Sequence, residues 1–222
     1  MTTNPNVMAK DLAYEYIRSR IASLDVEIGE FLKEEDVAAA TGISRTPVRE
    51  AIRRLAAEGL LELVPKKGAY VPAMSDRDLR ELMEARLTLE AFAIPSVIHQ
   101  ASDAVASLTE LLDSQGVLLA QGELDFERFF DQDLRFHSVF VAAGHNRVIS
   151  GVYDSLRARQ LRMAVTAVKG GAEKRLRAAH MEHTRILDAV RSRDEDALRK
   201  SIYAHGRSTL EAAQVEPLSR HW

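Results

Sequence analysis

The chain has 222 residues, of which 46% are hydrophobic and 28% are charged, a composition typical of a globular protein with one or two domains. It contains no cysteine, which excludes a disulfide framework, a thiolate zinc finger, an iron–sulfur cluster and a cysteine nucleophile. The formal net charge of −3 is not that of a generally basic nucleic-acid binder, so any contact with nucleic acid must depend on a local surface.

The first ten residues contain no apolar run like that of a secretory signal, and no stretch approaches the roughly 18 apolar residues that a membrane-spanning helix needs. We therefore expect a cytoplasmic protein with no membrane partner. Proline and glycine punctuate the first third of the chain, whereas the remainder is almost entirely helical in pattern. Because Pro72 discourages regular continuation and Ser75 can cap a helix, the sequence predicts two domains, at 8–72 and 75–214.

The first domain shows helical patterns followed by a hairpin. Apolar residues recur at helical spacing, and Pro47 falls in the first turn of a helix, where its missing N–H is harmless. The expected elements are helices at 9–24 and 34–41, a third helix opening at Ser44, and hairpin strands at 60–64 and 69–71. This order of elements is the winged helix-turn-helix pattern.

Side chains at two places in this pattern have chemistry suited to DNA. The third helix presents arginines at its start, the end that enters a major groove, where a guanidinium group can bind guanine O6 and N7 together. Its hydroxyl groups and N-terminus suit phosphate, and the hairpin turn is basic, with a glycine that allows close approach to a minor groove. The predicted DNA contacts are Ser44, Arg45, Thr46, Arg49, Lys66, Lys67 and Gly68.

The charge of this region can be explained in two ways. Between Ser44 and Tyr70 there are six basic and three acidic residues, a local net charge of +3 in an acidic chain. A positive patch is expected of a DNA-reading surface. Charge alone favours a solvated helix face held by ion pairs, so the DNA hypothesis depends on the charge, the fold pattern and the hairpin together.

The segment GISRTPVREAIRRLAAEGL, residues 42–60, resembles the recognition-helix signature of the GntR family of bacterial transcription regulators. The resemblance implies that Arg45 and Arg49 read bases, that Thr46 contacts a phosphate and that Gly68 lies at the wing tip. Where some members carry a DNA-contacting arginine in the preceding helix, this chain has acidic residues at 34–36.

The second domain reads as an antiparallel bundle of about six helices joined by short connections. Pro95 is expected to bend or interrupt the first of them. The predicted helices are 75–100, 102–121, 125–143, 146–168, 173–192 and 194–214.

Ionisable residues interrupt the apolar stripes of four of these helices. Asp133 and His137, spaced i and i+4, face the same direction, while His183, His205 and Arg86 each lie within an apolar stripe of another helix. Buried unpaired, such groups would cost several kcal/mol, so they need partners.

One aspartate and three histidines that converge in a bundle could bind a divalent metal such as zinc, nickel or manganese, with zinc favoured. Arg86 could then hold the carboxylate of a small acid. A single histidine on such a stripe is more often a hydrogen-bonded core residue, and His180 could replace His183 as the ligand.

The pattern of Asp133, His137, His183 and His205 also resembles the FCD ligand-binding domain, which accompanies the DNA-binding head in FadR-type members of the GntR family. The resemblance implies an all-helical effector domain in which these four residues hold a metal. It also implies that Arg86 contacts an effector carboxylate and that Asn146 is a further effector contact.

The sequence thus predicts a mainly α-helical, homodimeric transcription regulator that binds pseudo-palindromic operator DNA and is controlled by a small carboxylic acid at a metal site. Repression is the expected mode of action. Two alternatives stay open: a metal-dependent hydrolase, since a bound metal can activate water, and a DNA-binding regulator whose metal is purely structural.

Overall fold

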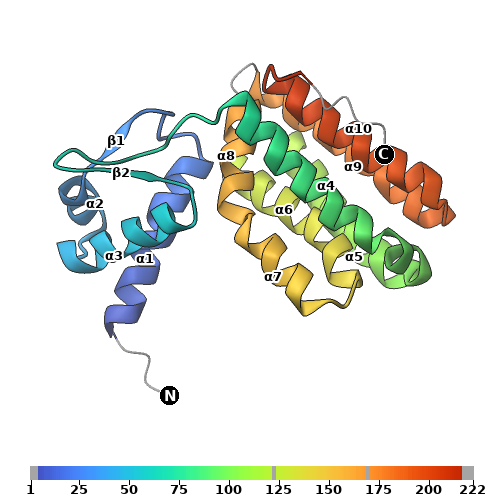
Figure 1. The fold of residues 1–222 in the computed structure, drawn as a ribbon, viewed down its shortest axis with the longest axis horizontal. Helices are drawn as coiled ribbons and strands as arrows, with labels where there is room; N and C mark the ends of the chain where they lie inside the picture. Colours follow the sequence, from blue (N-terminus) through green and yellow to red (C-terminus); the bar gives the residue numbers. More distant parts are fainter. Residues whose placement is uncertain (1–4, 122–123, 169–170, 217–222) are drawn as a thin grey trace. The chain divides into compact units, whose positions relative to one another are not determined.

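The computed structural model describes residues 5–121, 124–168 and 171–216 (Figure 1). Its contacts divide the chain into two compact units, Met1–Ala73 and Met74–Trp222, and each unit is described by itself. Within the described ranges there are ten helices and one three-stranded sheet, so the predicted fold class, a winged helix-turn-helix followed by an all-helical bundle, is confirmed. Among those helices, none combines the length and apolarity needed to cross a lipid bilayer.

The first unit is a three-helix head with a small antiparallel sheet. The sheet has the strand order β1-β3-β2, with Phe31 opposite Tyr70 and Leu63 opposite Ala69. Helices α1 and α3 pack against each other, and buried apolar residues such as Ile17 form the core between them. The elements are α1 (Pro5–Ala22), β1 (Phe31–Leu32), α2 (Glu34–Thr41), α3 (Arg45–Ala57), β2 (Glu62–Val64) and β3 (Gly68–Tyr70).

Helix α3 is amphipathic, and this orients the predicted DNA contacts. Val48, Ala51, Ile52 and Leu55 are buried on one face of the helix. Gly42 ends the preceding helix in the left-handed conformation, with φ of 69°, which is the usual role of glycine at a helix C-terminus. The sharp turn between α2 and α3 therefore follows from local sequence.

The head differs from the sequence prediction in two elements. Helix α1 begins at Pro5, four residues before the predicted start at residue 9. Strand β1 was not predicted, because its two residues are too few to show an alternating pattern and it forms only by pairing with β3.

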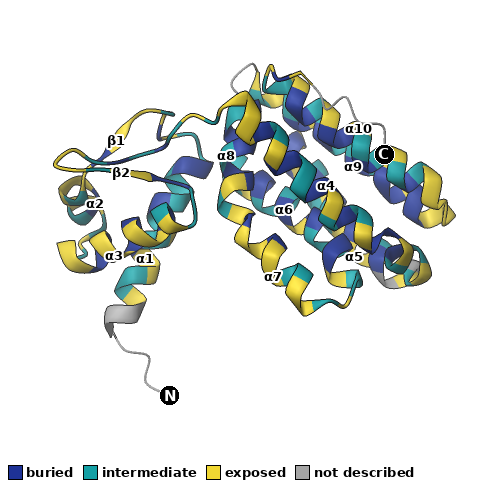
Figure 2. Ribbon diagram, viewed as in Figure 1, coloured by how far each residue is buried: buried dark blue, intermediate teal, exposed yellow. Residues whose placement is uncertain are grey.

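The second unit is a helical bundle (Figure 1). Helix α4 packs against α6 and α10, and α5 packs against α6 and α9. Figure 2 shows that the buried residues of these helices form continuous stripes, as amphipathic packing requires. The elements are α4 (Asp76–His99), α5 (Ala101–Ala120), α6 (Phe126–Ala143), α7 (Arg147–Ser155), α8 (Arg157–Ala167), α9 (Ala172–Ser192) and α10 (Glu195–Ala212).

The predicted extent of one helix is wrong, and one of the two effects expected of Pro95, an interruption of its helix, does not occur. The predicted helix 146–168 is two helices, α7 and α8, which meet at Leu156. The break lets the two segments bury different faces, with Tyr153 buried on α7 and the side containing Gln160 buried on α8. Pro95 does not interrupt α4, because Ile94 and other neighbours are fully buried and packing outweighs the lost hydrogen bond.

The start of α4 follows the sequence prediction. Ser75 is its N-cap: the hydroxyl accepts a hydrogen bond from the Asp78 N–H, and the Asp78 carboxylate accepts one from the Ser75 N–H. This reciprocal capping box fixes where α4 begins, at Asp76, three residues after the first unit ends at Ala73.

Candidate DNA-reading surface and metal centre

The start of α3 presents polar side chains to solvent. Ser44, Arg45, Thr46 and Arg49 are all exposed, on the side of α3 opposite its buried stripe. Ser44 occupies the N-cap position, but its side chain makes no capping hydrogen bond. The structure therefore places the four predicted contacts of this helix together on one accessible surface.

The two arginines on this surface are paired with acidic residues of α2. The Arg49 guanidinium donates two hydrogen bonds of 2.7 Å to the two carboxylate oxygens of Glu34, and Arg45 lies 3.2 Å from Glu35. The hydrogen bond from Arg49 holds the pKa of Glu34 below its usual value. Base contacts by Arg45 and Arg49 stay a prediction, and they would compete with these ion pairs for the same guanidinium donors.

The hairpin forms the predicted basic wing. Lys66 and Lys67 are exposed in its turn, where the Lys67 N–H donates to the Val64 carbonyl over 3.1 Å. A groove of about 420 Å³ between α3 and the wing is lined by residues that include Arg49, Arg53 and Lys66. Arg53, on the exposed face of α3, had no predicted role, although its i+4 spacing from Arg49 places it on the same side of the helix.

Gly68 has a different reason to be glycine from the one predicted. It has a φ of 110°, and a Cβ at this position would lie 2.6 Å from the Leu32 carbonyl oxygen. The missing side chain thus allows β3 to pair closely with β1 and supports the wing from inside. Contact between Gly68 and a minor groove stays a prediction.

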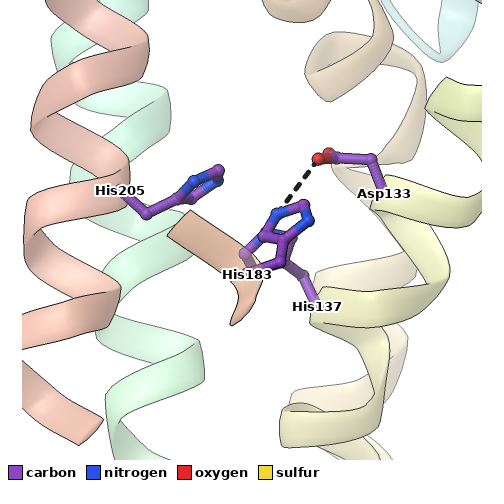
Figure 3. Close-up of side chains that lie close together, drawn as sticks. All are labelled: Asp133, His137, His183 and His205. Atoms are coloured by element: carbon purple, nitrogen blue, oxygen red, sulfur yellow. Dashed lines mark hydrogen bonds and ion pairs between the residues drawn. The ribbon is translucent and has the colours of Figure 1, made fainter. Parts of the chain in front are cut away.

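In the bundle, the structure brings together the four predicted metal ligands. One ligand atom from each of Asp133, His137, His183 and His205 lies within 4.8 Å of the others. Figure 3 shows the four side chains converging from α6, α9 and α10, with the 3.3 Å contact between Asp133 Oδ1 and His183 Nε2 drawn as a dashed line. The histidine rings are 0–3% exposed, so the cluster lies inside the bundle.

Two of the histidines are held from outside the cluster through their Nδ1 atoms. The acceptors are Gln115 Oε1 for His183 at 3.0 Å and Glu182 Oε2 for His205 at 2.8 Å. Carboxylate and amide oxygens can only accept, so the Nδ1 atoms of these two rings carry the proton. Glu90 Oε2 lies 3.3 Å from Nδ1 of His137 without forming a hydrogen bond.

This tautomer leaves the Nε2 lone pairs of His183 and His205 free to face the cluster. The Nε2 atoms of His137 and His183 are 3.2 Å apart, close enough to share one ion. Outer hydrogen bonds of this kind fix the rings of metal-binding histidines. The donor set, three imidazoles and a carboxylate, therefore fits a divalent metal such as zinc.

The electrostatics favour neutral imidazoles. Burial lowers the pKa of His205 to about 4, although the hydrogen bond to Glu182 opposes the shift, and burial also lowers the pKa of His183 well below its usual value. Burial raises the pKa of Glu90, but the facing His137 and Arg86 more than offset this effect. The rings of His183 and His205 are therefore held neutral, the state that metal binding requires of a histidine.

A small cavity adjoins the cluster. This bundle cavity has a volume of about 30 Å³ and is lined by Asp133, His205, apolar side chains and the polar residues Arg86, Gln160, Arg175 and Thr209. The Arg86 guanidinium is 3% exposed and donates from Nε to Glu90 over 2.8 Å, but its Nη2 has no hydrogen-bond partner. The cavity wall thus presents a buried cation with an unused donor next to two candidate metal ligands.

Two other predicted positions lie apart from this arrangement. Asn146 is the N-cap of α7, where its Oδ1 accepts hydrogen bonds from the N–H groups of Val148 and Ile149, and it does not line the bundle cavity. An effector contact by Asn146 therefore stays a prediction. His180 does not belong to the cluster, which favours His183 over His180 as the candidate ligand.

Sequence reasoning missed the residues that surround the ligands. Glu90, Gln115 and Glu182 come from three different helices, and Arg175 pairs with Glu182 over 3.1 Å. Glu90 had the clearest signal, because it lies four residues after Arg86 on a buried stripe and can pair with it.

The first unit is a winged head with exposed arginines, and the second is a helical bundle that encloses one aspartate and three histidines. This combination is the architecture of a DNA-binding transcriptional regulator. The chain belongs to the GntR family: residues 9–71 match the model of the bacterial regulatory proteins of the gntR family, and residues 81–208 match the FCD domain. The architecture is therefore the FadR type, and both resemblances seen in the sequence are confirmed.

Individual relatives agree with this assignment. The chain is 28% identical over 200 residues to the gluconate operon transcriptional repressor of Bacillus subtilis, covering 86% of this chain and 79% of the relative. The structure of E. coli McbR/YncC has a TM-score of 0.76 at 19% identity and covers 96% of this chain and 98% of that one.

The metal-free FCD domain of TM0439 is similar over a smaller part of the chain. It has a TM-score of 0.51 at 20% identity and covers 64% of this chain and 94% of that one, which shows a common fold. The family and these relatives are transcription regulators rather than enzymes.

Proposed function

We propose that the protein is an operator-binding repressor controlled by a small carboxylic acid that binds beside a divalent metal in the bundle cavity. Zinc is the favoured metal, and nickel or manganese suits the same ligands. Relatives that are named as repressors support the mode of action.

The single observation that carries the effector proposal is the unused donor of Arg86. A guanidinium that is 3% exposed with one nitrogen unpartnered is costly unless a ligand completes its hydrogen bonds. A carboxylate is the group that guanidinium binds most strongly. Asp133 and His205 line the same cavity, so an acid held by Arg86 would lie next to the metal ligands.

A metal held by Asp133, His137, His183 and His205 would supply a positive centre that attracts a second oxygen of the acid. The protein's own part is to fix the geometry. Glu90 accepts hydrogen bonds from Arg86 and Tyr153 over 2.8 Å each and faces His137, so one buried carboxylate orients both the metal ligand and the acid-binding cation.

At the DNA end, we propose that two heads of a homodimer bind a pseudo-palindromic operator. Arg45 and Arg49 would read bases, Ser44 and Thr46 would contact phosphates, and the wing lysines would follow the backbone. The exposure of all these side chains supports the assignment.

Helix α4 offers a direct connection between effector and head. It carries both Arg86 and Glu90 and begins at Asp76, three residues after Ala73, where the first unit ends. An acid that repositions α4 would change how the heads are held relative to the two half-sites. Such coupling requires that the acid bind the operator-bound and free proteins with different affinities.

The proposal is tested by a thermal-shift screen of small carboxylic acids on metal-loaded protein, followed by operator binding with and without the best acid. We expect an acid that raises the melting temperature and changes operator affinity. The effect should disappear in Arg86→Met, which keeps the length of the side chain but removes its charge. Equal acid affinity for free and operator-bound protein would contradict the coupling.

A purely structural metal is the second candidate, favoured by the small volume of the cavity, about 30 Å³. In that case a chelator should sharply lower the melting temperature, and no acid should change it. A regulatory site instead predicts that acids shift the melting temperature of the metal-loaded protein.

A further inference from the structure

Gln160 is a buried amide that the fold does not satisfy. It lies on α8 and is 2% exposed, and neither its Nε2 nor its Oε1 has a hydrogen-bond partner. Nearly all buried polar groups in proteins are hydrogen-bonded, so an amide with both ends unpaired calls for a specific explanation. Gln160 lines the bundle cavity together with Arg86 and Asp133, and the cavity is where its partner can enter.

The two unpaired groups in this cavity have different requirements. Arg86 Nη2 can only donate, and it needs an anionic acceptor such as a carboxylate. The amide of Gln160 offers one donor end and one acceptor end, so the group that satisfies it must both donate and accept. A hydroxyl group does this, whereas an ammonium group only donates and would add a second positive charge near Arg86.

The size of the cavity limits the rest of the ligand. Its volume of about 30 Å³ corresponds to roughly two water molecules, since one water needs about 10–15 Å³ on this measure. Phe129, Phe130 and Met163 form part of the remaining wall, and the second cation there, Arg175, is paired with Glu182 over 3.1 Å. The ligand is therefore a short chain with few polar groups.

From these requirements we propose that Gln160 is the specificity-determining residue of the effector site and selects a short hydroxy acid over the same acid without its hydroxyl. The inference rests on the proposed function, in which Arg86 takes the carboxylate. Gln160 then pairs with the hydroxyl through both ends of its amide. A site built to pair with a hydroxyl rejects the analogue that lacks it, because the buried amide would be left unsatisfied.

The test uses matched acids on the metal-loaded, full-length protein. Lactate, as both enantiomers, is compared with propionate, and glycolate with acetate, by calorimetric titration. We expect the hydroxy acid of each pair to bind at least about tenfold more tightly. In Gln160→Met, affinity for the hydroxy acid should fall to that of its partner, while affinity for the plain acid should stay within about twofold of the wild-type value.

A matched control is Gln100→Met, which makes the same chemical change at an amide that pairs with His145 outside the bundle cavity. This variant should keep the preference for the hydroxyl. Equal binding of both acids to the wild-type protein, or an undiminished preference in Gln160→Met, would overturn the specificity role while leaving acid binding intact. Failure of every acid to bind would overturn the proposed function and this inference together.

The ligand-free stability of the variant gives an independent readout. If Gln160 is kept for a ligand, replacing its unsatisfied amide by a thioether of similar length should raise or preserve the melting temperature of the acid-free protein. If Gln160 serves the fold instead, Gln160→Met should lower the melting temperature, and that result would contradict the proposal.

Discussion

Replacing Gln115 by leucine tests whether an outer amide controls the metal site. Gln115 accepts the Nδ1–H of His183 at 3.0 Å, and both side chains are 0% exposed, so water cannot replace the lost acceptor. An unsatisfied buried donor costs about 1–3 kcal/mol. In the metal-free protein the ring can avoid this cost by moving its proton to Nε2, which lies 3.3 Å from Asp133 Oδ1.

This shift of the proton to Nε2 is possible only in the absence of metal, because a bound metal needs the Nε2 lone pair of His183. The penalty therefore acts mainly on the metal-bound state, and we expect metal affinity to fall by about 10- to 100-fold. The assay is a zinc titration in competition with a chelator of known affinity, and circular dichroism confirms folding.

Two controls make the Gln115 test specific. Gln115→Glu keeps an acceptor for the Nδ1–H and should retain most of the metal affinity. Gln100→Leu removes an amide that pairs with His145 away from the cluster and should have no effect. Wild-type metal affinity in a folded Gln115→Leu variant would refute the reasoning that outer hydrogen bonds prepare the ligand set.

Three further predictions concern DNA and pH. Arg49→Ala should lower specific operator affinity by about tenfold or more, with a smaller loss of affinity for nonspecific DNA. Lys67→Ala should weaken both kinds of binding alike and reduce the slope of log affinity against log salt concentration by about one. If gel-shift titrations show that Arg49→Ala loses as much nonspecific as specific affinity, the division of roles is contradicted. Glu34→Gln should raise affinity for duplex DNA by about two- to fivefold, because it frees Arg49 from its ion pair, and unchanged affinity in the same assay would count against that competition. In metal-free protein, the pKa of His205 is lowered by burial to about 4, against about 6.5 when unfolded. The unfolded chain thus binds more protons between these values, so the free energy of unfolding should be highest above about pH 6.5 and should fall as the pH drops toward 4; urea denaturation that gives a flat profile would show that the ring is not held neutral.

The head could be predicted almost completely because its determinants are local. Gly42, Pro47 and the stripe through Val48 and Leu55 fix the turn and the buried face of α3, whichever protein they occur in. The ion pair between Arg49 and Glu34 could not be predicted in the same way, because the two residues lie on different helices and are 15 positions apart in the chain.

The cluster of candidate metal ligands was predictable as a set because helical periodicity turns sequence spacing into direction. Asp133 and His137 fall on one side of α6, and His183 and His205 interrupt apolar stripes that must face the core. Their convergence then follows from bundle packing.

The surroundings of the ligands were not predictable for the opposite reason. Gln115 meets His183 across 68 positions of sequence, and its identity as a partner depends on how α5 packs against α9. Gln160 was missed because the sequence predicts a single helix over 146–168. The helix instead breaks at Leu156, and the break is what places Gln160 of α8 in the cavity wall.

The account depends most on the claim that residues from three helices form one metal site in a DNA-binding regulator. The most direct measurement is the metal content of the purified wild-type protein and of His183→Ala by mass spectrometry, with operator binding measured in parallel. We predict about one divalent ion per wild-type chain, a large loss in the variant, and operator affinity retained by its intact head. Normal metal occupancy in His183→Ala would contradict the ligand assignment and the effector site built upon it.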